Sequence, residues 1–418
     1  MSGAGRAGLR VTLLALAGLC VSAATSRADL ELMSIPDSQL EPLTFAQLPG
    51  WNDDDHAAAF KTFAASCGMI VRNKSAQRIG RPIDLALRQI CQEVRWRRGT
   101  MGAAKARHFF ESHFRPLRVS KLGETDGFLT GYYEPIVQGS RVPTPEYTAP
   151  MYRRPSDLVA EVQQQPGMIF PNKGAVFRQV NAETRVPYYD RAEIEAGALD
   201  GKGLEICWLK DPSEAFSIQI QGSARVRLED GVTLRLNYDG HNGHPYTPIG
   251  RLLIERNIIP REQMTAQRLR DWMNGNPEEA KDLRRQNKSF VFFRVAELGE
   301  QDEAIGAQGI SLSAGRSIAA DRKLHGYGTP FWIDAELPLN GDTSKDPFRR
   351  LMIAQDTGSA IVGPARADIY FGAGKDAGRI AGRIRHTAKF VMLMPRSIDP
   401  IGRAPAVPFP TRKPKIDS

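Results

Sequence analysis

Apolar residues recur at helical spacing in three stretches near the N-terminus. Three aspartates, Asp53 to Asp55, precede an apolar-periodic stretch that runs to about Val71. Acidic residues at the start of a helix accept hydrogen bonds from free backbone amides and interact favourably with the helix dipole. The pattern therefore predicts a helix here, a second helix over Ile83 to Arg98 and a third over Gly102 to Phe114.

From Gly127 onward, alternating apolar residues and glycine-rich turns replace the helical spacing. The segment Phe128 to Tyr133 predicts a strand that ends at Pro135. Further strands joined by short turns are predicted at Ala215–Gln221, Ala224–Leu228 and Thr233–Tyr238. These strands indicate one small antiparallel barrel or sandwich.

Helical spacing returns after residue 246 and then gives way to strands. The predicted helices are Ile249–Arg256, Arg261–Met273 and Pro277–Gln286. The predicted strands are Phe290–Val295, Pro330–Ala335, Arg350–Ala354, Asp368–Phe371 and Phe390–Met394. Residues 395–418 contain six prolines and few apolar residues, so we predict a disordered or loosely attached tail over 396–418.

The first 28 residues have the pattern of a secretory signal peptide. Two arginines precede the apolar run Val11 to Ala24, which is too short for an ordinary membrane span. Ser26-Arg27-Ala28 fits a small-x-small cleavage site, so the mature chain would begin at Asp29 in the periplasm. Cys20 leaves lipidation open, but Leu19 stands where a bacterial lipoprotein signal has a small residue.

Composition places the chain among soluble globular proteins of two-domain size. It has 418 residues, of which 41% are hydrophobic and 25% charged. Removing residues 1–28 takes away three arginines and no acidic residue, so the formal charge falls from +9 to +6. That excess suits an anionic polymer, although a solvated basic surface would have the same charge. Secretion argues against nucleic acid as the partner.

Three cysteines remain after signal cleavage. Cys67 and Cys91 could bridge two successive helices in an oxidising compartment, whereas Cys207 lies in an apolar stretch and is expected to be buried. No cysteine spacing indicates zinc. His241 and His244 flank an Asn-Gly turn without a nearby third ligand, so we expect them to pack or support that turn and we predict no metal site.

The segment Asp356-Thr357-Gly358-Ser359 is also the signature of pepsin-like proteases. Those enzymes need two such aspartates that share one proton. The chain contains no second Asp-Thr-Gly or Asp-Ser-Gly, and a dimer could supply one, although dimeric chains of this type are usually far shorter. The absence of a second such motif weakens the protease hypothesis.

Asp368 follows Asp356 by twelve residues, across a turn rich in glycine and proline. Two strands joined in this way could bring two carboxyls into one cleft, where repulsion and partial burial would raise one pKa, as a general acid at neutral pH requires. The alternative is that both aspartates cap turns. Nearby, Gly372, Gly374 and Lys375 match neither a phosphate loop nor a dinucleotide fingerprint, so we predict no nucleotide cofactor.

Two segments pair aromatic or amide side chains with glycine, as sugar-binding clefts often do. They are Gly131-Tyr132-Tyr133-Glu134-Pro135 and Gln219-Ile220-Gln221-Gly222-Ser223-Ala224-Arg225. Tyrosine rings stack on sugar faces and amides bind hydroxyls. Paired tyrosines on a strand can equally be one core residue and one surface residue.

Taken together, these segments resemble the MltA family of lytic transglycosylases. Six motifs recur in the family's order over roughly residues 60 to 395, and they are Thr130–Pro135, Gln221–Ser223, Gly240–Tyr246, Asn287–Phe293, Gly315–Asp321 and the block from Asp356 to Asp368. The chain departs from the family pattern at Ser359 and at Ala224, where glycine is frequent.

The resemblance implies an α+β, mainly β fold. A double-psi β-barrel with the N-terminal helices would form the larger domain, residues 29–135 and 246–395. A smaller β-barrel, residues 136–245, would be inserted into it, with a glycan-binding groove between the two.

The resemblance also implies the chemistry. Asp368 would be the single catalytic acid and Asp356 a supporting carboxylate. Tyr132, Thr130, Gln221 and Ser223 are the expected sugar-binding residues, together with Gly131 and Tyr133 of the same strand. The substrate would be the glycan strands of peptidoglycan, and the enzyme a lytic exotransglycosylase that needs no cofactor. The chain would be a monomer, and association with the outer membrane is left open. A non-catalytic glycan-binding protein is the alternative, because the double-psi barrel does not determine function.

Overall fold

The computed structural model describes residues 35–72, 81–96, 101–161 and 176–398. Its largest sheet has eight strands in the order β1 (Ser38–Pro42), β2 (Phe114–Lys121), β17 (Arg385–Pro395), β14 (Pro330–Leu337), β15 (Asp346–Asp356), β13 (Ser317–Ala320), β16 (Arg366–Ala373) and β3 (Gly127–Glu134). Strand β17 also pairs with β3, so the six strands from β17 to β3 close into a barrel. Four of the predicted strands of the C-terminal third, at Pro330–Ala335, Arg350–Ala354, Asp368–Phe371 and Phe390–Met394, are confirmed in this sheet, and the fifth, Phe290–Val295, is β12 (Val291–Val295) of the second sheet.

A second sheet is built from the middle of the chain. Its order is β12 (Val291–Val295), β11 (Thr233–His241), β10 (Ser223–Leu228), β4 (Ile136–Ser140), β9 (Glu205–Leu209) and β5 (Ala149–Tyr152). A bridge between Arg153 and Phe293 brings its two edges together. A small third sheet contains β6 (Leu158–Ala160), β7 (Val176–Gln179) and β8 (Arg185–Pro187). The mixture of barrels and helices confirms the predicted α+β class.

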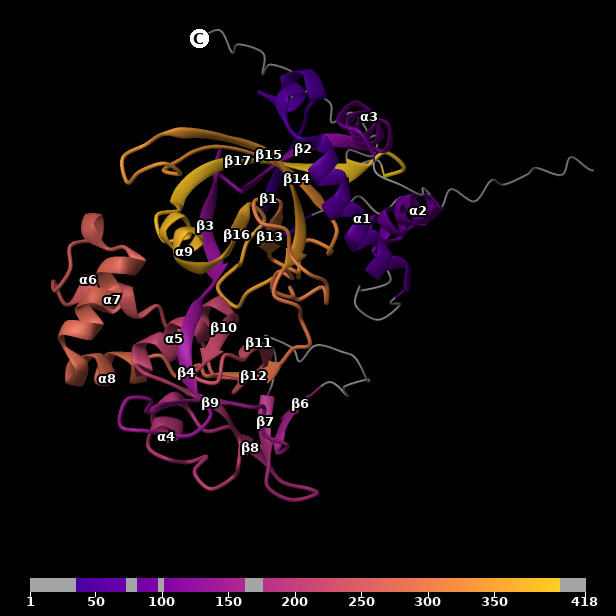
Figure 1. Cartoon of the computed structure of the whole chain (residues 1–418). Helices are drawn as coiled ribbons and strands as arrows, with labels where there is room; N and C mark the ends of the chain where they lie inside the picture. The colour runs from indigo at the N-terminus through magenta and orange to yellow at the C-terminus, as the bar shows by residue number, and fades with distance from the viewer. Residues whose placement is uncertain (1–34, 73–80, 97–100, 162–175, 399–418) are drawn as a thin grey trace, which may run out of the picture. The chain divides into compact units, whose positions relative to one another are not determined.

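Three N-terminal helices cover one side of the large sheet, close to their predicted bounds: α1 (His56–Arg72), α2 (Pro82–Trp96) and α3 (Ala103–His113). Asp55 accepts a hydrogen bond from the Ala58 amide at the start of α1, at 3.0 Å. The apolar faces of the helices pack with Trp332, Leu351 and Leu393 of the sheet in one buried cluster. This packing, seen in Figure 1, fixes α1 against β15.

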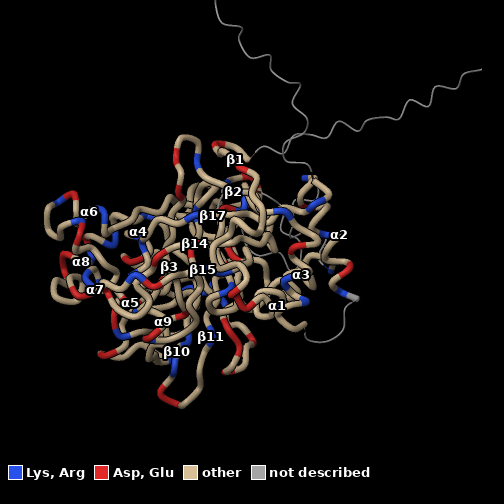
Figure 2. Tube along the Cα trace, turned by 90° about the horizontal axis from the view of Figure 1, so that it is seen from above, with Lys and Arg blue, Asp and Glu red and all other residues tan. Residues whose placement is uncertain are grey.

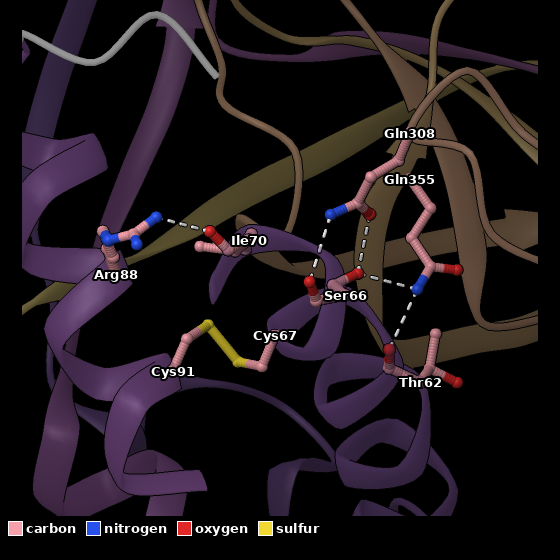
Figure 3. The surroundings of a disulfide bond; sticks show 8 residues. All are labelled: Thr62, Ser66, Cys67, Ile70, Arg88, Cys91, Gln308 and Gln355. Atoms are coloured by element: carbon pink, nitrogen blue, oxygen red, sulfur yellow. Dashed lines mark hydrogen bonds between the residues drawn. A yellow bond between two sulfur atoms is a disulfide. The ribbon is translucent and has the colours of Figure 1, made fainter. Parts of the chain in front are cut away.

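A disulfide joins Cys67 of α1 to Cys91 of α2, with their Cα atoms 4.7 Å apart. Figure 3 shows the polar contacts beside it. Gln355 of β15 donates to the Thr62 carbonyl at 2.9 Å and to the Ser66 hydroxyl at 2.8 Å. Helix α1 therefore holds the residue that precedes Asp356. The third cysteine, Cys207, is free and buried.

The segment Ala215–Gln221, predicted as a strand, is instead part of helix α5 (Pro212–Gln221). The side chain of Asp211 caps this helix by accepting from the Ser213 amide at 2.7 Å, proline occupies the first turn, and Gly222 ends the helix with φ +83°. The prediction relied on the alternating apolar residues and did not take these helix boundary residues into account. The neighbouring strand predictions correspond to β10 and β11.

Helices α4 (Arg191–Glu195), α6 (Ile249–Glu255), α7 (Ala266–Gly275) and α8 (Pro277–Arg285) complete the middle of the chain. The predicted helix Arg261–Met273 is interrupted, because Thr265 caps a new helix by accepting from the Arg268 amide at 3.0 Å. Apolar residues of α6, α7 and α8 pack with Phe216 of α5. Strand β12 pairs with β11, so Val291–Val295 belong to the second sheet, although they lie beyond residue 246, where the larger domain was expected to resume.

At the C-terminus the chain packs slightly further than predicted. The predicted tail begins at residue 396, but the Arg396 amide donates to the His113 carbonyl at 2.9 Å and Ile398 is buried. Residues 399–418, the predicted signal peptide 1–28 and Cys20 lie outside the described residues. Among the described helices, none is long and apolar enough to cross a membrane. Basic and acidic residues are interspersed along helices such as α7 and α8 (Figure 2).

Candidate active site

Asp356 and Asp368 lie on the two strands that flank β13. Asp356 of β15 and Asp368 of β16 are both in register with Ala319 of β13, one on each side. Residues in register share a face of the sheet, and two strand spacings separate the two backbones by about 10 Å. The residue between them, Ala319, has a small side chain and is buried. The fold therefore brings the two predicted aspartates to one site.

The Asp368 carboxyl is bound by the hydroxyl of Thr130, its register partner on β3. Thr130 Oγ1 donates to Asp368 Oδ1 at 2.7 Å. The same hydroxyl accepts a hydrogen bond from Arg366 Nη2, also at 2.7 Å. Arg366 precedes Asp368 by two positions on β16, and alternate residues of a strand face the same side. Sequence reasoning missed Arg366, although this spacing of two was available as a signal.

Burial raises the pKa of Asp368 to about 6. This value is the net result, in which the positive charge of Arg366 and the hydrogen bond from Thr130 oppose the effect of burial, and the nearby charge of Asp356 adds to it. A carboxyl with this pKa keeps a substantial protonated fraction near neutral pH, which a general acid requires.

Asp356 is held more firmly than Asp368. Its Oδ2 accepts from the Tyr132 hydroxyl at 2.8 Å, and its Oδ1 accepts from the backbone amides of Ala307 and Thr357, each at 2.8 Å. Burial raises the pKa of Asp356, and these three hydrogen bonds act against that increase. A carboxylate with so many donors is suited to a fixed supporting position. Ala307 is a second site residue that sequence reasoning missed.

An aromatic cluster lies beneath the two aspartates. Tyr132 and Tyr370 are register partners whose ring centroids are 5.2 Å apart, and they pack with Ala319 in one buried cluster. The Tyr370 hydroxyl donates to Glu303 at 2.7 Å. Tyr133 points to the other face of β3 and is half-buried. Of the two adjacent tyrosines, Tyr132 is therefore a core residue and Tyr133 is partly exposed.

Glycine at position 131 permits helix α9 (Gly374–Ala381) to pack against β3. A Cβ atom at Gly131 would lie 2.8 Å from the backbone Cα of Ala381 and 2.8 Å from the Phe371 ring. On the other face of the contact, a Cβ atom at Gly378 would lie 2.6 Å from the Tyr133 ring. Among the predicted site residues, Gly131 therefore has a packing function.

Gln221 and Ser223 lie at the junction between α5 and β10. Gln221 Oε1 accepts from the Tyr133 backbone amide at 3.0 Å, so it ties α5 to β3 directly beside Tyr132. Ser223 is the first residue of β10 and is buried. The structure thus brings Gln221 to the strand that carries Thr130 and Tyr132.

A buried ion cluster links the end of β3 to the second sheet. The carboxylate of Glu134, 1% exposed, accepts from Arg225 Nε at 2.7 Å and from Arg235 Nη2 at 3.2 Å. Both arginines also donate to the Asp302 carbonyl, at 3.0 and 2.8 Å. Arg225 stands in the Gln221–Arg225 segment, but its role was not predicted from the sequence.

The two histidines near the Asn-Gly turn serve the backbone. His241 Nδ1 accepts from the Gly243 amide at 2.8 Å, and His244 Nε2 lies 2.7 Å from the Tyr188 carbonyl oxygen. Within the described part of the chain, no group of three or more histidine, cysteine or acidic side chains could hold a metal ion. Gly372 and Gly374 adopt positive φ, +100° and +88°, where β16 turns into α9.

Two family models match the middle and the C-terminal part of the chain. The MltA specific insert domain matches residues 128–294, and the 3D domain matches residues 316–394. The membrane-bound lytic murein transglycosylase A of Vibrio cholerae is 37% identical over 233 residues, which are 54% of this chain and 61% of that protein. The chain thus spans less than two thirds of this curated relative.

Solved structures match over most of the chain. The crystal structure of membrane-bound lytic murein transglycosylase from Agrobacterium tumefaciens has a TM-score of 0.76 and 35% identity, covering 86% of this chain and 98% of that one. The structure of E. coli MltA with bound chitohexaose has a TM-score of 0.58 and 26% identity, covering 87% of this chain and 93% of that one.

Proposed function

This chain belongs to the MltA family of lytic murein transglycosylases, and we propose that it is a peptidoglycan lytic exotransglycosylase. Its substrate is the β-1,4 bond between N-acetylmuramic acid and N-acetylglucosamine, and its product is a 1,6-anhydromuramoyl end. The chitohexaose bound by the E. coli relative supports a glycan as the ligand.

The observation that carries this proposal is the environment of Asp368. Its pKa is raised to about 6 by burial, and its Oδ1 is occupied by Thr130, so one oxygen stays available for proton transfer. Hydrolases of the two-carboxylate type need a second group that acts as base or nucleophile. Asp356 is committed to three hydrogen bonds, which favours a mechanism with a single acid.

The reaction begins with Asp368 in its protonated form. Asp368 donates its proton to the glycosidic oxygen, and the bond from that oxygen to C1 of N-acetylmuramic acid breaks. The N-acetylglucosamine leaves with a free 4-hydroxyl, while positive charge develops at C1. The negative charge of Asp356, which lies on the same face of the sheet, stabilises the positive charge at C1.

The Asp368 carboxylate then acts as the base. It takes the proton of the muramic C6 hydroxyl as that oxygen bonds to C1, which closes the 1,6-anhydro ring. The carboxyl ends protonated, as it began, and no water is consumed. One group acts as acid and then as base, in line with general acid–base reversal. Tyr132, Tyr133, Gln221 and Ser223 remain our candidates for sugar binding.

Our proposal for the cellular setting is supported by the sequence and by the names of the relatives. We place the mature chain, cleaved after Ala28, in the periplasm, where it meets peptidoglycan. Relatives named membrane-bound support an association with the outer membrane. The chain would act as a monomer without a metal or cofactor.

The test is the substitution Asp368→Asn, which keeps the size of the side chain and removes the transferable proton. We expect wild-type protein to release anhydromuropeptides from purified peptidoglycan, measured by liquid chromatography and mass spectrometry. The variant should lose at least about 100-fold in rate, because general acid–base catalysis contributes 10²–10⁴-fold.

Asp376→Asn is the matched control. Asp376 has a side chain 90% exposed on α9, so its substitution should leave the rate near that of the wild type. Wild-type protein that binds peptidoglycan without forming anhydro products would support the glycan-binding alternative instead. Pepstatin-sensitive peptide cleavage would support the aspartic protease.

A further inference from the structure

The neighbours of Thr130 determine which hydrogen bond its hydroxyl donates and which it accepts. A guanidinium can only donate, so the bond from Arg366 Nη2 uses Thr130 Oγ1 as an acceptor. The single hydroxyl proton of Thr130 is then directed to Asp368 Oδ1, 2.7 Å away. Without Arg366, the hydroxyl could rotate and accept from the acid instead.

We propose that Arg366, acting through Thr130, is the positioning residue that confines the reacting proton of Asp368 to its Oδ2 atom. This inference rests on the proposed transglycosylase reaction. In a neutral carboxyl, the oxygen that accepts a hydrogen bond is the carbonyl oxygen, and the other oxygen carries the proton. Since Oδ1 accepts from Thr130, the acidic proton resides on Oδ2.

The same arrangement suits the second half of the reaction. After the proton is given up, the Thr130 bond to Oδ1 stabilises the carboxylate, and Oδ2 is free to accept the proton from the C6 hydroxyl. Both transfers therefore use one oxygen and one direction of approach, so Asp368 need not rotate between them. Fixed orientation of a reacting group contributes strongly to rate.

Arg366 is itself held in place by its surroundings. It donates to the carbonyl oxygen of Ala367, and its guanidinium lies 5.4 Å from the centroid of the Phe128 ring. It is partly buried on the face of β16 that carries Asp368. These contacts restrict the guanidinium to the position from which it reaches Thr130.

Other charged groups near Asp368 have distinct positions. Asp356 of β15 faces it across β13, whose own residues 317–320 carry no titratable side chain. On β3, the Tyr132 hydroxyl is committed to Asp356. On β17, Arg385 is in register with Thr130 and exposed. On α9 the charged residues are Lys375, Asp376 and Arg379, of which the last two pair at the surface.

The experiment measures the pH dependence of anhydromuropeptide formation. Its variants are Thr130→Val, which removes the hydroxyl at constant shape, Thr130→Ser, which retains it, Arg366→Met and Arg366→Gln. Arg379→Gln removes an exposed arginine and serves as the charge control. Thermal unfolding at pH 5 and pH 8 establishes that each variant is folded.

We expect the alkaline limb of the rate profile to move upward by about one pH unit in Thr130→Val and Arg366→Met. Each variant loses a feature that favours the carboxylate, either the hydrogen bond or the opposite charge. Their maximal rates should fall about tenfold or more. Thr130→Ser should restore the wild-type limb, and Arg379→Gln should not move it. Arg366→Gln retains a donor, so its limb should move while its maximal rate falls less than that of Arg366→Met.

A purely structural role for Arg366 and Thr130 predicts a different result. In that case rates and melting temperatures fall, but the alkaline limb stays at the wild-type pH in every variant, which would overturn the inference. If Arg366→Met does not fold, Arg366→Gln and the Thr130 pair decide the question. Failure of the proposed function is distinguished by the wild type, which would then form no anhydro product at any pH.

Discussion

At the scale of single residues, Asp368 is held in surroundings that favour its protonated form. An acid whose pKa is higher in the folded chain than in the unfolded chain destabilises the fold at pH values above both, and not below both. For Asp368 those values are about 6 and the ordinary 3.8. The wild-type fold therefore loses stability as the pH rises through this window.

Asp368→Asn should accordingly stabilise the protein at neutral pH. The amide is neutral at every pH and can still accept from Thr130. A difference of about two pH units corresponds to about 3 kcal/mol, which is the upper limit of the expected gain at pH 7.5. Chemical denaturation at pH 7.5 and pH 4 measures it, and most of the gain should be absent at pH 4. A gain of equal size at both pH values would contradict the titration argument.

The two aspartates of the site and two residues that bind them, Thr130 and Tyr132, could be selected from the sequence, but Arg366 and Ala307 were missed. The motifs identified Asp356 and Asp368 through their resemblance to a family. Arg366 was within reach, because it precedes Asp368 by two residues on a strand. Ala307 was not, because a backbone amide in a loop has no residue-type signal, and its contact with Asp356 depends on the path of the chain.

At the scale of elements, the contact between β3 and α9 determines where Thr130 lies. Two glycines allow the helix to approach the strand closely. Gly131 of β3 leaves room for the backbone of Ala381, and Gly378 of α9 leaves room for the ring of Tyr133. Since Thr130 directly precedes Gly131, a shift of β3 would move the hydroxyl relative to Asp368.

Gly131→Ala should therefore impair both stability and activity. Its Cβ atom meets the backbone of Ala381, which cannot rotate aside, and overpacking of this kind costs about 1–3 kcal/mol. Thermal unfolding and anhydromuropeptide release should both decline. Gly275→Ala, at the end of α7, is the control, because a Cβ atom there meets nothing within 4 Å. Equal effects of the two substitutions would argue against the packing explanation.

Helix α5 shows why periodicity alone misled at one element. Its residues Phe216, Ile218 and Ile220 alternate as in a strand, while Asp211, Pro212 and Gly222 are typical helix boundary residues. Over ten residues, the boundary signals outweigh the alternation. The N-terminal helices were predicted closely because their helical spacing is clear, and the first of them also has a capping residue, Asp55.

At the scale of the whole described molecule, the Glu134 cluster joins the two sheets. Glu134 ends β3 of the large sheet, whereas Arg225 and Arg235 belong to β10 and β11 of the second sheet. Breaking a buried pair by removing one partner leaves uncompensated buried charge. The cluster therefore contributes to the arrangement in which Gln221 reaches β3.

Glu134→Gln should destabilise the protein by about 3 kcal/mol, the lower end of the cost of leaving buried charges unpaired. The equivalent change in an exposed pair, Asp230→Asn beside Arg141, should cost much less, because solvent screens exposed charges. Urea denaturation monitored by tryptophan fluorescence compares the two. Similar losses for both variants would show that burial of the cluster contributes little.

Sheet order is the part of the fold that the sequence alone did not reveal. Strand β13 lies between β15 and β16, although it precedes both in the chain by some distance. This order places Ala319 between the aspartates, and no spacing along the chain indicates it. The pairing is non-local, so only the resemblance to a known family suggested that the two carboxyls would meet.

The Cys67–Cys91 disulfide has a consequence for when the molecule matures. Helix α1, which the bond joins to α2, also binds Gln355 through Thr62 and Ser66, one residue before Asp356. Such bonds form only where thiols are oxidised. With the periplasmic location that we propose, a newly made chain would lack this disulfide in the reducing compartment of synthesis and would gain it after export. The enzyme would thus become able to cleave peptidoglycan in the periplasm, where its substrate lies, and not in the compartment where it is synthesised.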